Sequence, residues 1–174
     1  MSSLERLWAG WRSEYIESVS GKPAGKSEPD DCVFCRILNS GEPDEVTHIM
    51  WRHPGGLAFA ILNAYPYSTG HLMVMPTRHV GELEALTVEE SAALWQGLSQ
   101  SVVALKTAYG PDGLNVGANL GRSAGAGVPG HFHIHALPRW YGDTNFMTSV
   151  ADARVLPEAL PVTAKKVREA WPRA

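Results

Sequence analysis

The chain has 174 residues, of which 44% are hydrophobic, and a formal net charge of −3, which fits one ordinary globular domain with a single core. It contains no basic arm and no apolar run of about 20 residues, so we expect neither a nucleic-acid polymer nor a membrane as partner. The N-terminal sequence lacks the apolar core of a secretory signal, so we expect the cytoplasm as its location.

Residues 1–30 are expected to form an N-terminal helix and a mobile loop. Apolar residues at helical spacing extend over residues 4–19, whereas residues 20–31 are rich in Gly, Pro, Ser and Lys. The main domain is expected over residues 31–151. Residues 152–174 are expected to form a tail of the same domain, ending in a helix near Val162 to Trp171.

The middle of the chain predicts about five strands and one long helix. Thr87 and Glu90 have the spacing of a capping box, and Gly110 is suited to end the helix. This helix is inserted once among strands joined by short turns, which favours an α+β domain with a mainly antiparallel sheet. A short helix is expected over Cys35 to Leu38, and strands are expected over Val46 to Trp51, Leu57 to Leu62, Leu72 to Met75, Leu114 to Leu120 and the histidine run described below.

The only two cysteines are spaced as Cys32-Val-Phe-Cys35. This spacing is compatible with half of a zinc site, with a redox pair or with two thiols of no special role. A redox pair is expected directly after a strand of a βαβ unit, whereas these cysteines follow a polar loop. The context therefore favours zinc.

Three histidines alternate in the run His131-Phe-His133-Ile-His135. In a strand, alternate side chains point to one face, so all three imidazoles would line one exposed side while the apolar residues between them pack on the other. Such a row suits either a metal ion or an imidazole nucleophile that its neighbours orient.

A glycine-rich loop, residues 117–130, leads directly into the histidine run. Glycine permits positive φ angles, so that successive backbone N–H groups can converge on an anion. Asn119, Arg122 and Ser123 add side-chain donors. A phosphate-binding loop beside an imidazole nucleophile is the arrangement that phosphoryl or nucleotidyl transfer requires.

Four separated features now agree in order with one family. The run from His131 to Leu137 matches the pattern His-φ-His-φ-His-φ-φ, in which φ is apolar. Asn63, the segment Gly70 to Pro76 and the cysteine pair stand where that family has them. From Asp31 to Trp140 the chain resembles the histidine triad (HIT) family.

The ends of the chain resemble one bacterial branch of this family, described as diadenosine tetraphosphate phosphorylase-like. The matching segments are Leu4 to Tyr15 and Pro138 to Phe146. The resemblance implies the histidine triad fold, with residues 31–151 as the catalytic domain between flanking N- and C-terminal helices. It also implies a homodimer.

The resemblance implies a role for each matching residue. His133 would be the nucleophile that forms a covalent nucleotidyl-histidine. His135 would orient the site, its backbone carbonyl fixing the tautomer of His133, and His71 would support both from the neighbouring strand. Asn63 would contact a ribose. The phosphates would lie against Asn119 and the stretch from Gly125 to Gly127. Independently of the resemblance, Trp140 directly follows the histidine run and is a candidate for closing over a base or shaping a subunit contact.

The zinc-bearing relatives also imply a metal set. Here it would consist of Cys32, Cys35, His79 and His131, a closed Cys₂His₂ site of the structural kind. This zinc ion would tether the N-terminal segment to the histidine run. The competing interpretation is a catalytic metal held by all three triad histidines.

The implied activity is cleavage of dinucleoside polyphosphates such as diadenosine tetraphosphate, with water or inorganic phosphate as acceptor. Alternatives are hydrolysis of nucleoside phosphoramidates or other nucleotides and, in another class, non-catalytic nucleotide binding. One departure concerns the leaving group. Many members carry Gly-Gln-Ser/Thr before the first triad histidine, whereas Gly125 to Gly130 here contains neither glutamine nor a hydroxyl, so no leaving-group acid is assigned.

Overall fold

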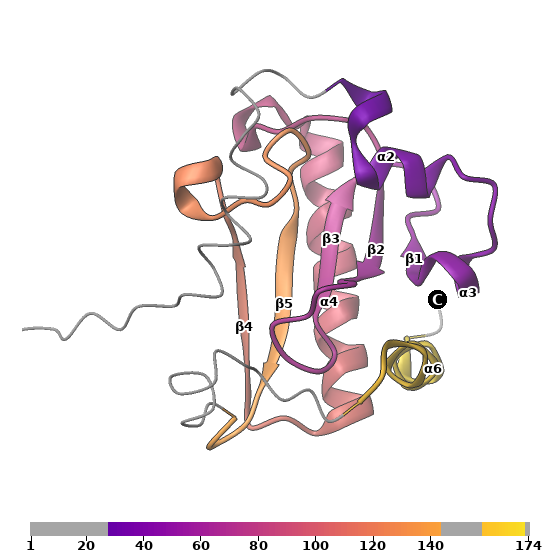
Figure 1. Ribbon diagram of the computed structural model, residues 1–174, viewed down its shortest axis with the longest axis vertical. Helices are drawn as coiled ribbons and strands as arrows, with labels where there is room; N and C mark the ends of the chain where they lie inside the picture. The colour runs from indigo at the N-terminus through magenta and orange to yellow at the C-terminus, as the bar shows by residue number, and fades with distance from the viewer. Residues whose placement is uncertain (1–27, 144–157, 173–174) are drawn as a thin grey trace, which may run out of the picture.

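The computed structural model describes residues 28–143 and 158–172. At its centre is a five-stranded antiparallel sheet in the order β1-β2-β3-β5-β4 (Figure 1). This arrangement confirms the expected α+β fold. The strands are β1 (Ile49–Arg52), β2 (Ala58–Leu62), β3 (Leu72–Pro76), β4 (Gly113–Ala118) and β5 (Ile134–Arg139). The helices are α2 (Val33–Leu38), α3 (Asp44–Thr47), α4 (Val88–Tyr109) and α6 (Leu160–Ala170), with short 3-10 helices at Pro29–Asp31, Leu83–Ala85 and Arg122–Ala124.

The long helix α4 covers one face of the sheet, and both of its ends follow local sequence signals. Thr87 and Glu90 form the expected capping box, which satisfies two backbone N–H groups at the N-terminus. Gly110 ends the helix with a left-handed φ of 52°. The buried face of α4 joins side chains of β2, β3 and β5, including Ala136, and Phe132 just before β5 in the main hydrophobic core.

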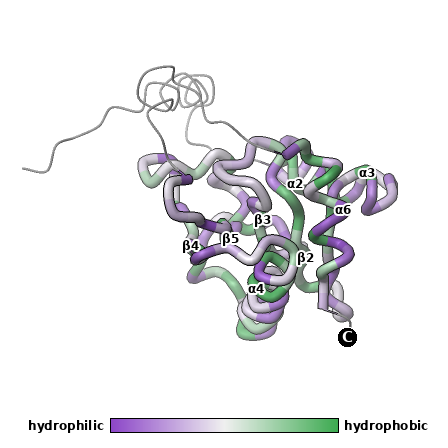
Figure 2. Tube along the Cα trace, turned by 90° about the horizontal axis from the view of Figure 1, so that it is seen from below, coloured by the Kyte–Doolittle hydropathy of each residue, from purple (hydrophilic) through white to green (hydrophobic). Residues whose placement is uncertain are grey.

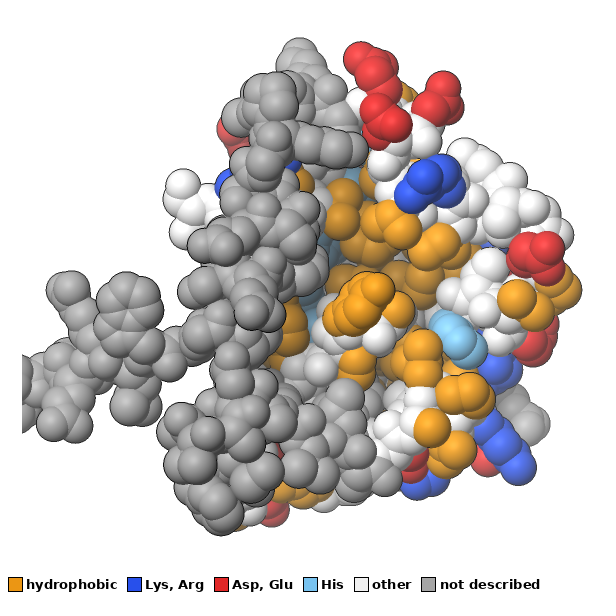
Figure 3. Space-filling model, viewed as in Figure 1, with side chains coloured by type: hydrophobic (Ala, Val, Ile, Leu, Met, Phe, Trp, Pro, Cys, Tyr) orange, Lys and Arg blue, Asp and Glu red, His pale blue; other side chains and the backbone are white. Residues whose placement is uncertain are grey.

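The opposite face of the sheet is covered by α2. The sheet lies between α4 and α2 (Figure 2), and α6 packs against α4 and β1. A second core fills the space under α2, where Phe34 meets Phe59 and Met75. On this side of the molecule, apolar side chains gather in the middle and charged ones lie toward the rim (Figure 3).

Two expected strands begin later than their composition suggests. Val46 and Thr47 are β-branched, yet they belong to the helical turn α3, and β1 begins only at Ile49. His48 between them has a left-handed φ of 58°, which redirects the chain into the strand. In the histidine run only His135 lies within a strand, since β5 starts at Ile134.

The helix expected over residues 4–19 and most of the loop after it lie outside the described residues. The expected C-terminal helix is present as α6. None of the helices in the described ranges is long and apolar enough to cross a bilayer. The domain limits at residues 31, 151 and 152 stay predictions.

Candidate active site and metal centre

The expected histidines meet on the α2-covered face of the sheet. Strands β3 and β5 are antiparallel neighbours, with Met73 opposite His135. His71 precedes β3 by one residue and His133 precedes β5 by one residue, so the pairing of the two strands brings both beside His135. The residues between the triad histidines point to the α4 side, as expected. The expected exposure is wrong, however, because all of these imidazoles are at least 93% buried under α2 and the loop before β3.

His133 is held so that one particular ring nitrogen is free. Its Nδ1 lies 2.8 Å from the carbonyl oxygen of His131. A carbonyl only accepts, so Nδ1 carries the proton and donates, and Nε2 keeps its lone pair. Burial lowers the pKa of His133 below its ordinary value, which keeps the imidazole neutral. The carbonyl that fixes the tautomer therefore belongs to His131 and not to His135, which corrects the expectation.

His71 and His135 form a hydrogen-bonded pair with a defined direction. Nδ1 of His71 accepts from the backbone N–H of Tyr67 at 3.1 Å, so its proton is on Nε2. This Nε2–H donates to Nδ1 of His135 at 2.8 Å. The proton of His135 is consequently on Nε2, a buried atom that has no hydrogen-bond partner among the described residues.

Both members of this pair stay neutral over the ordinary pH range. Burial, reinforced by the neighbouring His135 and His133, lowers the pKa of His71 to about 3. Burial and the nearby His133 lower the pKa of His135 to about 4. Neutral imidazoles have one donor and one acceptor each, which the alternating chain of hydrogen bonds requires.

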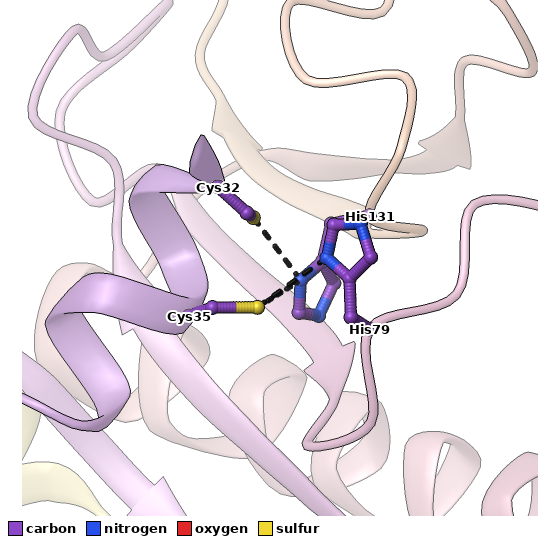
Figure 4. Close-up of side chains that lie close together, drawn as sticks. All are labelled: Cys32, Cys35, His79 and His131. Atoms are coloured by element: carbon purple, nitrogen blue, oxygen red, sulfur yellow. Dashed lines mark hydrogen bonds between the residues drawn. The ribbon is translucent and has the colours of Figure 1, made fainter. Parts of the chain in front are cut away.

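The four expected metal ligands also converge. Cys32 and Cys35 point from the start of α2 toward His79 in the loop after β3 and His131 in the run before β5 (Figure 4). Sγ of Cys32 lies 3.4 Å from Nδ1 of His131, and Sγ of Cys35 lies 3.3 Å from Nδ1 of His79. The four ligand atoms all lie within 4.8 Å of one another. This cluster can hold a metal ion.

The geometry fits a tetrahedral zinc ion in particular. With Zn–S and Zn–N bonds of about 2.3 and 2.1 Å, adjacent sulfur and nitrogen ligands of a tetrahedron are about 3.6 Å apart. The observed separations of 3.3 to 3.5 Å match that spacing. Nε2 of His131 donates to the carbonyl of Pro76 at 2.8 Å, which leaves Nδ1 bare for a metal, as is usual for a ligating histidine. Burial raises the pKa of Cys35 to about 11, so a bound cation is needed to keep its thiolate.

The loop that carries His79 is held by three contacts close to that residue. The backbone N–H of Phe132 donates to the carbonyl of Val80 at 2.6 Å. A Cβ at Gly81 would lie 2.5 Å from the carbonyl oxygen of Pro129, so only glycine permits this approach. Arg78 then forms a two-pronged ion pair with Glu90, whose carboxylate also caps α4.

The glycine-rich loop lies beside the histidines. Gly117 stands opposite His135 in the β4–β5 pairing, and a Cβ built on it meets nothing within 4 Å, so the surface there is open within the described structure. Asn119 donates to the carbonyl of Gly125 at 3.4 Å, closing the loop around the short helix that contains Arg122 and Ser123. Gly127 follows, half-buried, before the chain enters the histidine run.

Trp140 is not brought to the triad. It follows β5 at the end opposite His133, and its ring packs edge-on against Tyr109, with centroids 6.2 Å apart. With a rise of about 3.3 Å per strand residue, Trp140 lies roughly 16 Å along the strand from His135. Within this chain, it is not placed to close over a base at His133.

Comparisons with known proteins agree with this geometry. A family model for the HIT domain matches residues 54–141, and the AP-4-A phosphorylase of Mycobacterium tuberculosis is 40% identical over 172 residues, covering 98% of this chain and 86% of that protein. The chain belongs to the histidine triad (HIT) family. Residues 131–135 are thus the histidine run of a HIT protein.

Solved structures of HIT proteins share the fold. A hypothetical histidine triad nucleotide-binding protein from Sulfolobus tokodaii superposes with a TM-score of 0.63 at 30% identity, covering 80% of this chain and 91% of that one. A zinc-bound histidine triad family protein from Mycobacterium smegmatis gives a TM-score of 0.65 at 24% identity, with 82% and 94% covered.

Two aromatic residues at the site were not singled out from the sequence. Phe34 lies between the two cysteines and packs edge-on against both His131 and His133, with centroids 5.6 and 5.4 Å away. The ring of Tyr67 lies over His71 and His135, at 4.8 and 5.8 Å. The place of Phe34 inside the Cys-x-x-Cys segment could have indicated that it lies at the site. Nothing in the sequence around Tyr67 indicates its contact with the histidines.

Proposed function

We propose that this protein cleaves dinucleoside polyphosphates by transferring a nucleotidyl group to Nε2 of His133 and then to inorganic phosphate. The observation that carries the proposal is the fixed tautomer of His133. Its proton is held on Nδ1 by the carbonyl of His131, so Nε2 presents a lone pair from a neutral, buried imidazole.

The reaction proceeds in two displacements at one phosphorus. Nε2 of His133 attacks the α-phosphorus of diadenosine tetraphosphate, forming a P–N bond while the P–O bond to the ATP leaving group breaks. An oxygen of inorganic phosphate then attacks the same phosphorus, the P–N bond breaks and ADP leaves. The balance is diadenosine tetraphosphate plus phosphate to ATP plus ADP, and the two inversions retain the configuration at phosphorus.

The surrounding groups stabilise the charge that builds on the phosphate oxygens. The Nε2–H of His135 is a donor without a partner in the described structure, so a phosphate oxygen supplies the acceptor it lacks. We assign the polyphosphate to the glycine-rich loop, where Asn119, Arg122, Ser123, Gly125 and Gly127 lie. With the Gly-Gln-Ser/Thr segment missing, His135 takes the place of the unassigned donor to the leaving group.

We infer the substrate and the acceptor from the AP-4-A phosphorylase of Mycobacterium tuberculosis, which is 40% identical and matches 98% of this chain. The test is product analysis of the purified protein with diadenosine tetraphosphate, with and without millimolar phosphate. ATP and ADP formed only with phosphate support the proposal. AMP and ATP formed regardless of phosphate would make the protein a hydrolase, and no turnover would overturn the dinucleoside polyphosphate substrate.

We propose that the metal at the Cys₂His₂ cluster is a structural zinc ion. All four ligand positions are filled by Cys32, Cys35, His79 and His131, which leaves no open position for substrate. When bound, zinc supplies a rigid crosslink between α2, the loop after β3 and the histidine run. The alternative of a catalytic metal on three triad histidines is disfavoured, because Nδ1 of His131 faces the two cysteines and the free Nε2 of His135 carries a proton.

We also propose that the protein is a cytoplasmic homodimer. Cys32 and Cys35 form no disulfide, and a reducing compartment keeps such cysteines available to a metal. Strand β4 is an edge of the sheet, and Val116 on it is 48% exposed. Trp95 and Val103 on α4 are 68% and 49% exposed. An open strand edge and exposed apolar side chains on a helix are each typical of subunit contacts. Light scattering tests this proposal by measuring the molar mass in solution. The wild type should have the mass of a dimer, and Trp95→Glu should shift it toward the monomer.

A further inference from the structure

The side chain of Asn63 is locked beside His71 by the loop between β2 and β3. Asn63 directly follows β2, and its backbone N–H donates to the carbonyl of His71 at 2.9 Å. Its side-chain Oδ1 accepts from the backbone N–H of Tyr65 at 2.9 Å. A backbone N–H only donates, so this contact identifies the oxygen end of the amide.

The nitrogen end of the same amide consequently faces His71. Nδ2 of Asn63 lies 3.2 Å from Nδ1 of His71, and the backbone N–H of Tyr67 lies 3.1 Å from the same atom. Two donors converge on one ring nitrogen, so a proton on that nitrogen would face both of them. His71 is 1% exposed, so no water is at hand to accept such a proton.

This arrangement determines where the proton of His135 lies. With Nδ1 of His71 as acceptor, its Nε2–H donates to Nδ1 of His135, and the proton of His135 remains on Nε2. If the tautomer of His71 were reversed, its bare Nε2 would accept from Nδ1–H of His135. Nε2 of His135 would then have no proton to offer.

We propose that Asn63 is a positioning residue, whose amide, together with the N–H of Tyr67, sets the tautomers of His71 and His135 so that Nε2 of His135 presents a proton to the substrate. The inference rests on the proposed nucleotidyl transfer for its catalytic consequence. It differs from the ribose contact implied by the resemblance, because Asn63 acts through two histidines. The ring of Tyr67 over both imidazoles holds the pair in this geometry.

The test is Asn63→Asp in the full-length protein, since a carboxylate accepts where the amide donated. Nitrogen-15 NMR reads the protonation of each ring nitrogen of His71 and His135, and steady-state kinetics with diadenosine tetraphosphate separates kcat from KM. The matched control is Asn115→Asp, which introduces the same charge on exposed β4, where Arg139 already donates to the side chain. Asn63→Ala serves if the aspartate variant does not fold.

We expect Nδ1 of His71 to be unprotonated in the wild type and protonated in Asn63→Asp, with kcat lower by about tenfold or more and KM little changed. Asn63→Ala retains the Tyr67 donor and should lose less of kcat. An unaltered His71 tautomer in Asn63→Asp, an unchanged kcat in Asn63→Ala, or a raised KM at constant kcat in either variant would overturn the proposal. Failure of the wild type to turn over would count against the proposed function alone, because the NMR readout needs no substrate.

Discussion

The carbonyl oxygen of His131 accepts the Nδ1 proton of His133 at 2.8 Å, while the imidazole of the same His131 faces both cysteines at 3.4 and 3.5 Å. One residue thus contributes its side chain to the metal cluster and its backbone to the nucleophile. A metal ion that fixes the position of His131 also fixes the carbonyl that selects the tautomer of His133. The structural site and the reaction site are connected through a single residue.

Replacement of the nucleophile separates chemistry from binding. In His133→Asn the P–N bond cannot form, so turnover of diadenosine tetraphosphate should fall by a factor on the order of a thousand or more. Nucleotide affinity, measured by calorimetry, should change little, because the phosphate loop is untouched. His53→Asn, at a half-buried histidine outside the site, is the control. Substantial activity in His133→Asn would contradict the covalent mechanism.

Removal of one thiol should release the metal and loosen the nucleophile. Cys32→Ser is expected to bind less than a tenth of the zinc found in the wild type by elemental analysis, because a closed structural site needs all its ligands. The melting temperature should fall, since metal affinity contributes directly to the stability of the folded state. Full zinc content in Cys32→Ser together with an unchanged melting temperature would exclude the Cys₂His₂ site.

The buried histidine pair makes stability depend on pH. Their native pKa values of about 3 for His71 and about 4 for His135 lie below the value of about 6.5 in an unfolded chain. Between these limits the unfolded state binds more protons than the native state. The free energy of unfolding should therefore have its maximum contribution from these histidines above pH ~6.5. It should fall as the pH decreases below that value, by up to about 1.4 kcal/mol per pH unit for each histidine.

Urea unfolding from pH 7.5 to 4.5 measures this dependence. His71→Gln lacks one of the two titrating histidines. Its free energy of unfolding should therefore decrease less between pH 7.5 and 4.5 than that of the wild type, by up to the contribution of one histidine. Loss of zinc at low pH affects both proteins equally, so the difference between their pH profiles gives the contribution of His71 alone. Identical pH profiles would show that His71 does not titrate with the expected low pKa.

Glu90 joins the start of α4 to the loop that holds His79. Its carboxylate accepts from Arg78 at 2.7 and 2.8 Å and from the backbone N–H of Thr87. Glu90→Gln keeps the size but loses the charge, so the melting temperature should fall by a few degrees and the zinc affinity should decrease. Glu84→Gln, at an exposed position nearby, should change neither. Equal behaviour of the two variants would contradict this role.

Features with short-range causes could be predicted from the sequence. The capping box and Gly110 define α4 because each acts on its own turn of backbone. The strand expected at Val46 was wrong because β-branched composition does not register the reversal at His48, where the chain takes a left-handed conformation before β1. At this point the packing of α3 and β1 against the rest of the fold overrides the local β-propensity of the sequence.

The sequence pointed to the histidines and to the metal cluster, but it also pointed to Trp140, which lies away from them, and it gave the hydrogen bonds among the histidines only in part. Alternation in the histidine run and the spacing of the cysteines pointed to residues that do converge. The sequence cannot show which carbonyl a ring nitrogen meets, so His135 was assigned the backbone role that belongs to His131. Burial of the histidines was missed because it depends on Phe34 of α2 and on Tyr67 in the loop before β3, which are far from the histidine run in sequence.

The central claim is a covalent nucleotidyl group on His133, and the most direct measurement is its trapping. The protein is mixed with diadenosine tetraphosphate without phosphate, quenched in base to preserve the P–N bond, and analysed by mass spectrometry. The account predicts the mass gain of one adenylyl group, located on the peptide containing His133. When phosphate is added before the quench, the adduct should be lost and ADP released. Turnover with no adduct, or an adduct on another residue, would contradict it.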